Sequence, residues 1–176
     1  MKGQQFRMRH LQVYNWGTFS DLHEIPIAEE GYLFVGPSGA GKSTLLDAFT
    51  ALLIPPRWLN FNAAARESER GRDRNLLSYV RGAWAAQKDD ESGEIVTRYL
   101  RPSTTWSGLA LTFVRGETEV VTLAQLLWVR GSSHEVRRLF LVFERSFRLT
   151  EVAHFDLDVR RLKAHLPEAM IRDEFP

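Results

Sequence analysis

The 176-residue chain contains no cysteine, which excludes a disulfide framework and a thiolate metal site. Its net charge is only +1, so any contact with nucleic acid has to come from a local basic patch. No apolar run reaches the ~18 residues of a membrane span, and the polar, basic residues 1–10 lack the apolar core of a signal peptide. These absences favour a cytoplasmic protein that does not enter a membrane.

The residues that are present suffice for one domain with a core, because 44% are hydrophobic and 11% aromatic. Alternating apolar and polar residues predict a half-buried strand over 6–14. A short edge strand is expected at 23–27, where Pro26 cannot donate a backbone hydrogen bond. Residues 31–35 are predicted to form a third strand and residues 45–53 a helix.

The rest of the chain divides by composition into further parts of a single, partial domain. After a P-loop core at 1–56, we expect a basic insertion at 57–93, with a short helix or strand around 76–84. Residues 94–150 are β-rich, and their strands are predicted at 95–100, 109–115, 119–129 and 137–144. In the last part, 151–176, residues 156–166 are predicted to form an amphipathic helix, and Pro176 does not resemble a natural end.

A phosphate-binding motif lies between the predicted third strand and the helix. It fits G-x-x-x-x-G-K-[ST] in full: Gly36, Pro37, Ser38, Gly39, Ala40, Gly41, Lys42 and Ser43. The glycines allow successive N–H groups to point at phosphate oxygens, and the helix adds the positive end of its dipole. Lys42 is expected to reach the β- and γ-phosphates, Ser43 to bind Mg²⁺, and Thr44 to contact the α-phosphate. The motif predicts ATP and Mg²⁺ as ligands but does not define the reaction.

Phosphoryl transfer also needs a second carboxylate on the metal and a group that positions water. Glu144, at the end of an apolar run, is a candidate, although a strand with a charged end is the preferred interpretation. Gln125 lies in an apolar run and is expected to be an ordinary strand residue. Asp47, one turn into the predicted helix, is expected to be a surface charge. The chain therefore reads as half of a catalytic site.

Several stretches resemble a known family more specifically than the phosphate loop does. "LQVYNWGTFSDLHEI", "RNLLSYVRGAW" and "VTLAQLLWVRG…RLFLVFERSF" are similar to the SMC-like ATPase subunits of Wadjet plasmid-defence systems, the JetC family, and to their MukB/MksB-like relatives. The resemblance implies an α/β P-loop NTPase fold: the N-terminal half of an ABC/SMC-type head, a mixed sheet with an antiparallel β-rich subdomain and flanking helices. In that family a long coiled coil separates this half from a C-terminal half, which supplies the signature motif, the metal-binding aspartate and the catalytic glutamate. The family's Q-loop is expected beyond Pro176.

The resemblance also implies roles for individual residues. Residues 36–44 would hold ATP and Mg²⁺, with Lys42 as the catalytic residue. Asn15, Trp16 and Thr18 would lie near the nucleotide base, although core packing is an alternative for Trp16. Five arginines are candidates for DNA contact, or for a solvated loop: Arg66, Arg70, Arg72, Arg74 and Arg81. Arg81 is alternatively a nucleotide sensor, and the last helix carries a cationic stripe or a merely solvated face with Arg160, Arg161 and Lys163.

The function that this resemblance implies is ATP-driven head dimerisation that powers DNA loop extrusion, in anti-plasmid defence or chromosome organisation. The expected partners are the C-terminal head half, a second SMC-like head, a kleisin, winged-helix subunits, a nuclease subunit and DNA, in a cytoplasmic, nucleoid-associated complex. The fragment alone is expected to bind ATP without turning it over. The alternatives are a RecF- or Rad50-type DNA-repair ATPase, a small P-loop kinase, and a nucleotide-binding module without turnover.

Overall fold

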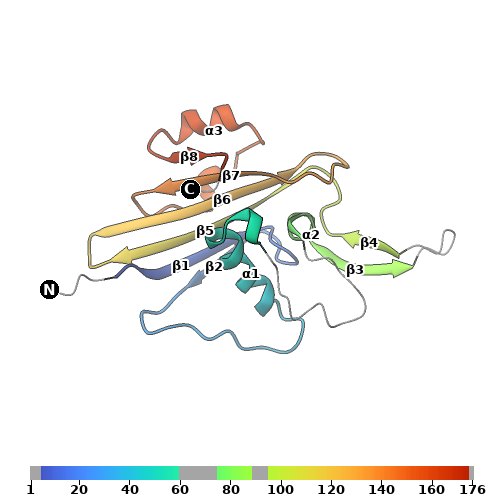
Figure 1. The fold of residues 1–176 in the computed structure, drawn as a ribbon, viewed down its shortest axis with the longest axis horizontal. Coiled ribbons are helices and arrows are strands. Elements are labelled where there is room, and N and C mark those ends of the chain that lie inside the picture. Colours follow the sequence, from blue (N-terminus) through green and yellow to red (C-terminus); the bar gives the residue numbers. More distant parts are fainter. Residues whose placement is uncertain (1–4, 60–74, 89–94, 175–176) are drawn as a thin grey trace.

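An antiparallel sheet forms the centre of the fold (Figure 1). The computed structural model describes residues 5–59, 75–88 and 95–174, and within them this sheet has six strands in the order β2-β1-β5-β6-β7-β8. Every neighbouring pair is antiparallel. The strands are β1 (Arg7–Tyr14), β2 (Leu22–Pro26), β5 (Thr105–Arg115), β6 (Glu119–Val129), β7 (Arg137–Phe143) and β8 (Met170–Arg172).

The predicted strands around this sheet are confirmed with small changes in their bounds. β5 begins four residues earlier than the predicted start at 109, because Thr105 to Gly108 pair with the end of β6. There Trp106 lies opposite Trp128, a cross-strand pair of large side chains. β8, which has three residues, was not predicted; a strand this short carries too little alternation to show a period.

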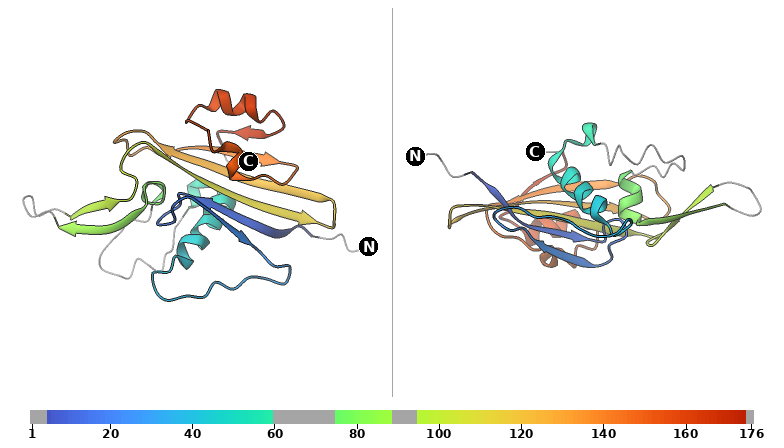
Figure 2. Two further views of the ribbon diagram at one scale, coloured as in Figure 1. Left: turned by 180° about the vertical axis from the view of Figure 1, so that it is seen from behind. Right: turned by 90° about the horizontal axis from the view of Figure 1, so that it is seen from below.

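Helices cover both faces of the sheet (Figure 2). On one face α1 (Lys42–Leu53) and α2 (Leu76–Arg81) pack on Leu11, Leu109 and their neighbours. On the other face the 3₁₀ turn η3 (Leu149–Val152) and α3 (Val159–His165) pack on the alternate residues of the same strands. A second 3₁₀ turn, η1 (Pro56–Trp58), follows α1. Among the described residues no helix is both long and apolar enough to cross a membrane.

A separate hairpin extends from the end of α2, away from the main sheet (Figures 1 and 2). It consists of β3 (Ala83–Lys88) and β4 (Ile95–Tyr99). The predicted short element around 76–84 is therefore a helix followed by the start of a strand. Gly82 joins the two with a φ of 67°, and a Cβ there would lie 2.6 Å from the carbonyl oxygen of Gly17. Only glycine fits this close approach between the hairpin and the turn after β1.

The prediction of a strand over residues 31–35 is wrong. In the structure this segment belongs to the long connection between β2 and α1 and has no strand assignment. Leu33 and Val35 are exposed, at 80% and 79%, whereas Phe34 is half-buried against the core. An apolar sequence rich in aromatic residues favours extended backbone, but a strand forms only where a neighbour supplies hydrogen-bond partners. β1 is already paired on both of its edges, by β2 and β5.

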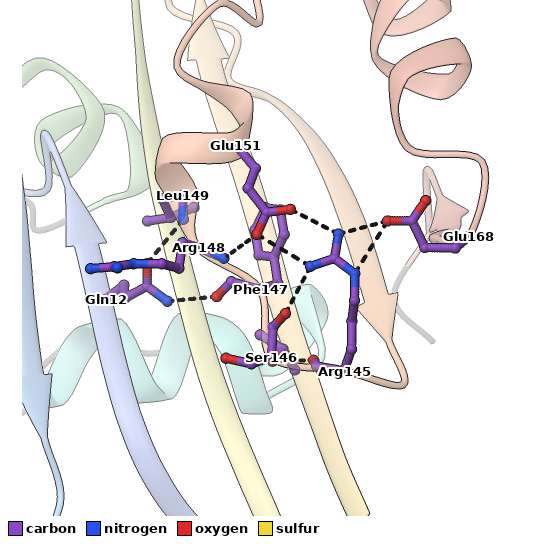
Figure 3. A network of polar contacts seen from close by, with 9 residues as sticks. Gln12, Arg145, Ser146, Phe147, Arg148, Leu149, Glu151 and Glu168 are labelled. Atoms are coloured by element: carbon purple, nitrogen blue, oxygen red, sulfur yellow. Dashed lines mark hydrogen bonds and ion pairs between the residues drawn. The ribbon is translucent and has the colours of Figure 1, made fainter.

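The loop after β7 is fixed to the sheet by a buried glutamine (Figure 3). The amide nitrogen of Gln12, on β1, donates to the carbonyl oxygen of Phe147 at 2.8 Å. Its amide oxygen accepts from the backbone N–H of Leu149 at 2.9 Å. Gln12 is fully buried, so both hydrogen bonds are shielded from water. Gln125 on β6 is equally buried, but neither amide atom has a hydrogen-bond partner among the described residues.

We expect substitution by leucine to affect stability differently at these two glutamines. Gln12→Leu leaves two backbone groups of the 147–149 loop buried without partners, and we expect it to lower the free energy of unfolding by about 3 kcal/mol. Gln125→Leu removes a side chain that makes no hydrogen bond and should be neutral or stabilising. Urea denaturation of both variants measures the difference. Equal destabilisation by both would contradict this assignment.

A charged network holds the same loop at its outer side (Figure 3). The guanidinium of Arg145 donates to Glu151 at 2.8 Å and to Glu168 at 2.6 Å, and these bonds raise the pKa of Arg145. Burial raises the pKa of Glu151, but hydrogen bonds from Arg145 and from the backbone of Arg148 outweigh it and lower that pKa. The hydrogen bond from Arg145 likewise lowers the pKa of Glu168. The network links η3 to the segment before β8.

Because the pKa of Glu151 is lower in the folded chain, its contribution to stability is present at neutral pH. It is lost as the pH falls from the unfolded value near 4.5 through the folded one. We expect Glu151→Gln to cost about 1 kcal/mol at pH 7, since the pair is partly exposed. Chemical denaturation at a series of pH values should show the variant and the wild type converging in acid. Glu117→Gln, in the exposed β5–β6 turn, is the control, and a constant difference at all pH values would refute the assignment.

Candidate nucleotide-binding site

The phosphate loop runs as a series of turns into the first residue of α1. Gly41 is the N-cap of α1 with a φ of 89°, and Gly39 has a φ of 84°. A Cβ at Gly41 would lie 2.7 Å from the ring of Phe19. Both the backbone angle and this contact require glycine at position 41. The sequence motif therefore has the loop geometry expected for a phosphate cradle.

The first turn of α1 offers its backbone N–H groups to the loop. No described side chain caps the helix, so these donors lack the usual side-chain partner. Lys42 folds back over the loop, and its Nζ donates to the carbonyl oxygens of Gly36 at 2.7 Å and Pro37 at 2.8 Å. Ser43 and Thr44 follow in the same turn and are half-buried. A phosphate bound in the loop would contact a lysine, a hydroxyl and the N-terminus of a helix.

Trp16 packs against the first turn of α1. Its side chain is fully buried, and its indole N–H donates to the carbonyl oxygen of Thr44 at 2.8 Å. The ring stacks on that of Tyr79 with centroids 4.4 Å apart and an angle of 10°. The expectation that Trp16 contacts the base is therefore corrected in favour of core packing: its polar atom is bonded to α1 and its ring faces α2.

Asp47 extends the same connection one turn further along α1. It is buried, not at the surface as expected, and it accepts a hydrogen bond from the hydroxyl of Tyr79. The backbone N–H of Gly17 donates to the carbonyl oxygen of Tyr79 at 2.8 Å. α2 is thus held against both α1 and the turn after β1. A buried carboxylate in this position fixes the distance between the two helices.

A cleft of about 710 Å³ opens above the phosphate loop. Four parts of the described chain line it: the turn after β1, the loop with the start of α1, the N-terminal part of α2, and the β3–β4 hairpin. The lining residues are Gly17, Thr18, Ser38, Gly39, Ala40, Gly41, Lys42, Ser43, Thr44, Asn75, Ser78, Tyr79, Ala83, Trp84, Thr97 and Tyr99. Sequence reasoning did not assign the residues from α2 and the hairpin to the site: part of them lie in the stretch 74–84 that carries the family resemblance, but only the fold brings them to the loop.

The turn after β1 contributes less to the cleft than predicted. Thr18 lines it, as expected for a residue near the nucleotide. Asn15 does not: its side-chain oxygen accepts from the backbone N–H of Asp21 at 3.0 Å and closes the turn. Its φ of 49° lies in the left-handed region that asparagine tolerates. Asn15 therefore shapes the turn rather than contacting the base.

Arg81 does not have the exposure that a DNA contact or nucleotide sensor needs. It is 4% exposed. Its guanidinium donates to the backbone carbonyl oxygens of two loops, at Pro102, Ser103, Gly131 and Ser133. This arginine joins the loop before β5 to the loop after β6. The other four arginines proposed for DNA, at 66, 70, 72 and 74, lie outside the described residues, while Arg160, Arg161 and Lys163 are exposed on α3.

The described lining of the cleft contains no carboxylate. Glu144 is exposed just after β7 and is not part of the lining, and Gln125 is a buried residue of β6, as the preferred interpretation had it. The phosphate loop thus brings together a cradle of backbone groups, the ammonium of Lys42 and the hydroxyl of Ser43. A second metal ligand and a water-positioning group are not among the described lining residues.

Comparison with known proteins agrees with this geometry. Residues 8–68 match a family model described as the P-loop containing region of an AAA domain. The match includes most of β1, β2, the phosphate loop and α1, and the phosphate loop with the start of α1 lines the cleft. Among curated proteins, none matches the chain. The chain therefore carries a P-loop NTPase-like region, and this class of site binds nucleotides.

A substitution at Arg81 can test whether its hydrogen bonds, rather than its positive charge alone, stabilise the fold. Arg81→Lys keeps the positive charge but cannot serve four carbonyl oxygens in two loops. We expect it to lower the free energy of unfolding by about 2–3 kcal/mol, the scale of hydrogen bonds from a charged donor. Urea denaturation tests this, with Arg160→Lys on exposed α3 as the matched control. A variant as stable as the wild type would show that the two loops do not depend on Arg81.

Proposed function

We propose that the chain is the N-terminal, ATP-binding half of the head of an SMC-like ABC-type ATPase. The observation that carries this proposal is the exposure of Leu33 and Val35 in the segment 31–35, which leads directly into the phosphate loop. Leu33 and Val35 project from an extended segment with the sequence of a buried strand. Such a segment is suited to accept a neighbouring strand from another part of a head.

An apolar hollow beside this segment supports the same idea. It has a volume of about 620 Å³ and is lined by Met8, Ile27, Tyr32, Phe34, Leu46 and Phe49, among others. Tyr32 and Leu46 are about half exposed. A large exposed apolar surface next to a phosphate loop is costly unless another polypeptide covers it. In the proposal, the C-terminal head half is that polypeptide.

The composition of the cleft is a second support. Phosphoryl transfer needs a metal-binding carboxylate and a group that positions water, and the described lining has neither. In an ABC-type head these groups come from the C-terminal half, and a second head closes over the nucleotide. The fragment would then bind ATP and Mg²⁺ by itself and hydrolyse ATP only after completion and dimerisation.

The sequence resemblance extends the proposal to a biological role. An SMC-like head of the Wadjet or MukB/MksB-like type would couple ATP-driven closing and opening to movement of DNA, in plasmid defence or chromosome organisation. Its partners would be a kleisin, winged-helix subunits and, in a defence complex, a nuclease subunit. A small P-loop kinase fits less well, because its sheet is parallel with alternating helices, whereas every strand pair of this main sheet is antiparallel.

A comparison of turnover with and without a coexpressed C-terminal head half tests the proposal. We expect ATP binding by the chain alone and ATP hydrolysis only with both halves. Lys42→Ala should weaken ATP binding at least tenfold, since the lysine is the principal cation at the β- and γ-phosphates. Calorimetric titration measures the binding, and phosphate release measures the turnover.

The matched control is Lys88→Ala, a lysine at the exposed end of β3 that does not line the cleft. It should bind and turn over ATP like the wild type. Hydrolysis by the isolated chain at the rate of the complete head would instead identify a self-contained P-loop enzyme and overturn the proposal.

A further inference from the structure

Trp84 is an exposed tryptophan that forms part of the cleft wall opposite the phosphate loop. It lies near the start of β3 and is 53% exposed, although its ring could bury a large apolar area. It is not an isolated surface residue, because Ala83, Thr97 and Tyr99 line the cleft beside it. One wall of the cleft therefore presents the aromatic rings of Trp84 and Tyr99, and the other presents the phosphate-binding backbone.

A strand irregularity places this ring in the cleft. The pairing between β3 and β4 shifts register between Ala83 and Ala85, so Trp84 is the extra residue of a bulge. In a regular strand, neighbouring side chains point to opposite faces, yet Ala83 and Trp84 both line the cleft. Bulges are a common means of redirecting one side chain near a site. The local backbone is thus arranged to turn this ring toward the phosphate loop.

The rest of this wall is already engaged in its own structure. Asn75 and Ser78 bind each other's backbone as the capping box of α2, with the Ser78 N–H donating to Asn75 at 2.8 Å. The guanidinium of Arg81 lies 5.9 Å from the ring centre of Tyr99 and is itself held by backbone carbonyls. Trp84 is the aromatic ring of this wall that remains half exposed. A planar ligand group in the cleft would find its stacking surface there.

We propose that Trp84 stacks on the purine base of a nucleotide whose phosphates lie in the loop. This inference rests on the proposed nucleotide binding and adds the residue that holds the base. The cleft volume of about 710 Å³ lies in the range of pockets that enclose a small organic ligand. The phosphates would occupy the wall formed by residues 38–44, and the base would extend across to the hairpin. Stacking on an aromatic ring tolerates different bases but favours the larger purine face.

Titration with two ligands distinguishes the contribution of the base to binding from that of the phosphates. Binding of ATP and of inorganic tripolyphosphate, each with Mg²⁺, is measured by calorimetry for the wild type and for Trp84→Ala. We expect Trp84→Ala to weaken ATP binding at least about fivefold, the lower end of base–aromatic stacking. Tripolyphosphate binding should be unchanged, because it has no base to stack. The preference of the wild type for ATP and GTP over CTP should disappear in the variant.

Two variants act as controls. Trp84→Phe keeps an aromatic face and should recover most of the ATP affinity. Trp58→Ala removes another exposed tryptophan, 65% exposed on η1 and outside the cleft, and should bind ATP like the wild type. Because Trp84 and Trp58 are both exposed, thermal unfolding of either alanine variant should match the wild type. These controls exclude a general effect of losing a surface tryptophan.

The outcomes are distinguishable. Unchanged ATP affinity in Trp84→Ala, or an equal loss of ATP and tripolyphosphate binding, would overturn the stacking role while nucleotide binding stands. If the wild type binds neither ligand, or if Lys42→Ala binds both as well as the wild type, the proposed function fails and the stacking role fails with it. Selective loss of ATP binding in Trp84→Ala alone supports the inference.

Discussion

The packing of Trp16 between α1 and α2 is the constraint on which the site depends. Its indole donates to the first turn of α1, and its ring stacks on Tyr79. Tyr79 in turn donates to Asp47 on α1 and accepts from the N–H of Gly17. These contacts join β1, α1 and α2 around one aromatic pair in the core. The phosphate loop leads directly into α1, so the position of the loop relative to the sheet follows from this packing.

The cleft is a consequence of the same arrangement. Once α2 is fixed on α1, its C-terminal Gly82 directs the β3–β4 hairpin over the loop, and Arg81 fixes the two loops that lie beside it. The phosphate cradle then forms one wall of the cleft and an aromatic surface the other. The two walls come from separate segments of the sequence, and the fold brings them together. The antiparallel sheet serves as the common support, and Leu33 and Val35 remain exposed in the segment before the phosphate loop.

The sequence predicted those parts of the structure that depend on local pattern. The phosphate loop, α1 and the strands β1, β6 and β7 follow from a motif or from alternation. The predicted strand at 31–35 failed because strand formation depends on a neighbour, which a sequence window does not contain. For Trp16 the structure confirms the alternative of core packing, and for Arg81 it contradicts contact with DNA or nucleotide. Neither outcome could be read from the sequence, because burial and the positions of backbone acceptors depend on the tertiary fold. Trp84 became a site residue only when the fold placed its hairpin over the loop.

Amide hydrogen exchange over residues 31–35 tests the central claim most directly. If the chain is half of a head, this segment is unpaired in the chain alone and becomes a paired strand in the completed head. Its amides should exchange rapidly in the isolated chain and become strongly protected when a C-terminal head half is bound, because paired amides exchange only on opening. Rapid exchange in a complex that hydrolyses ATP would contradict the claim, since the head would then be complete without this segment being paired.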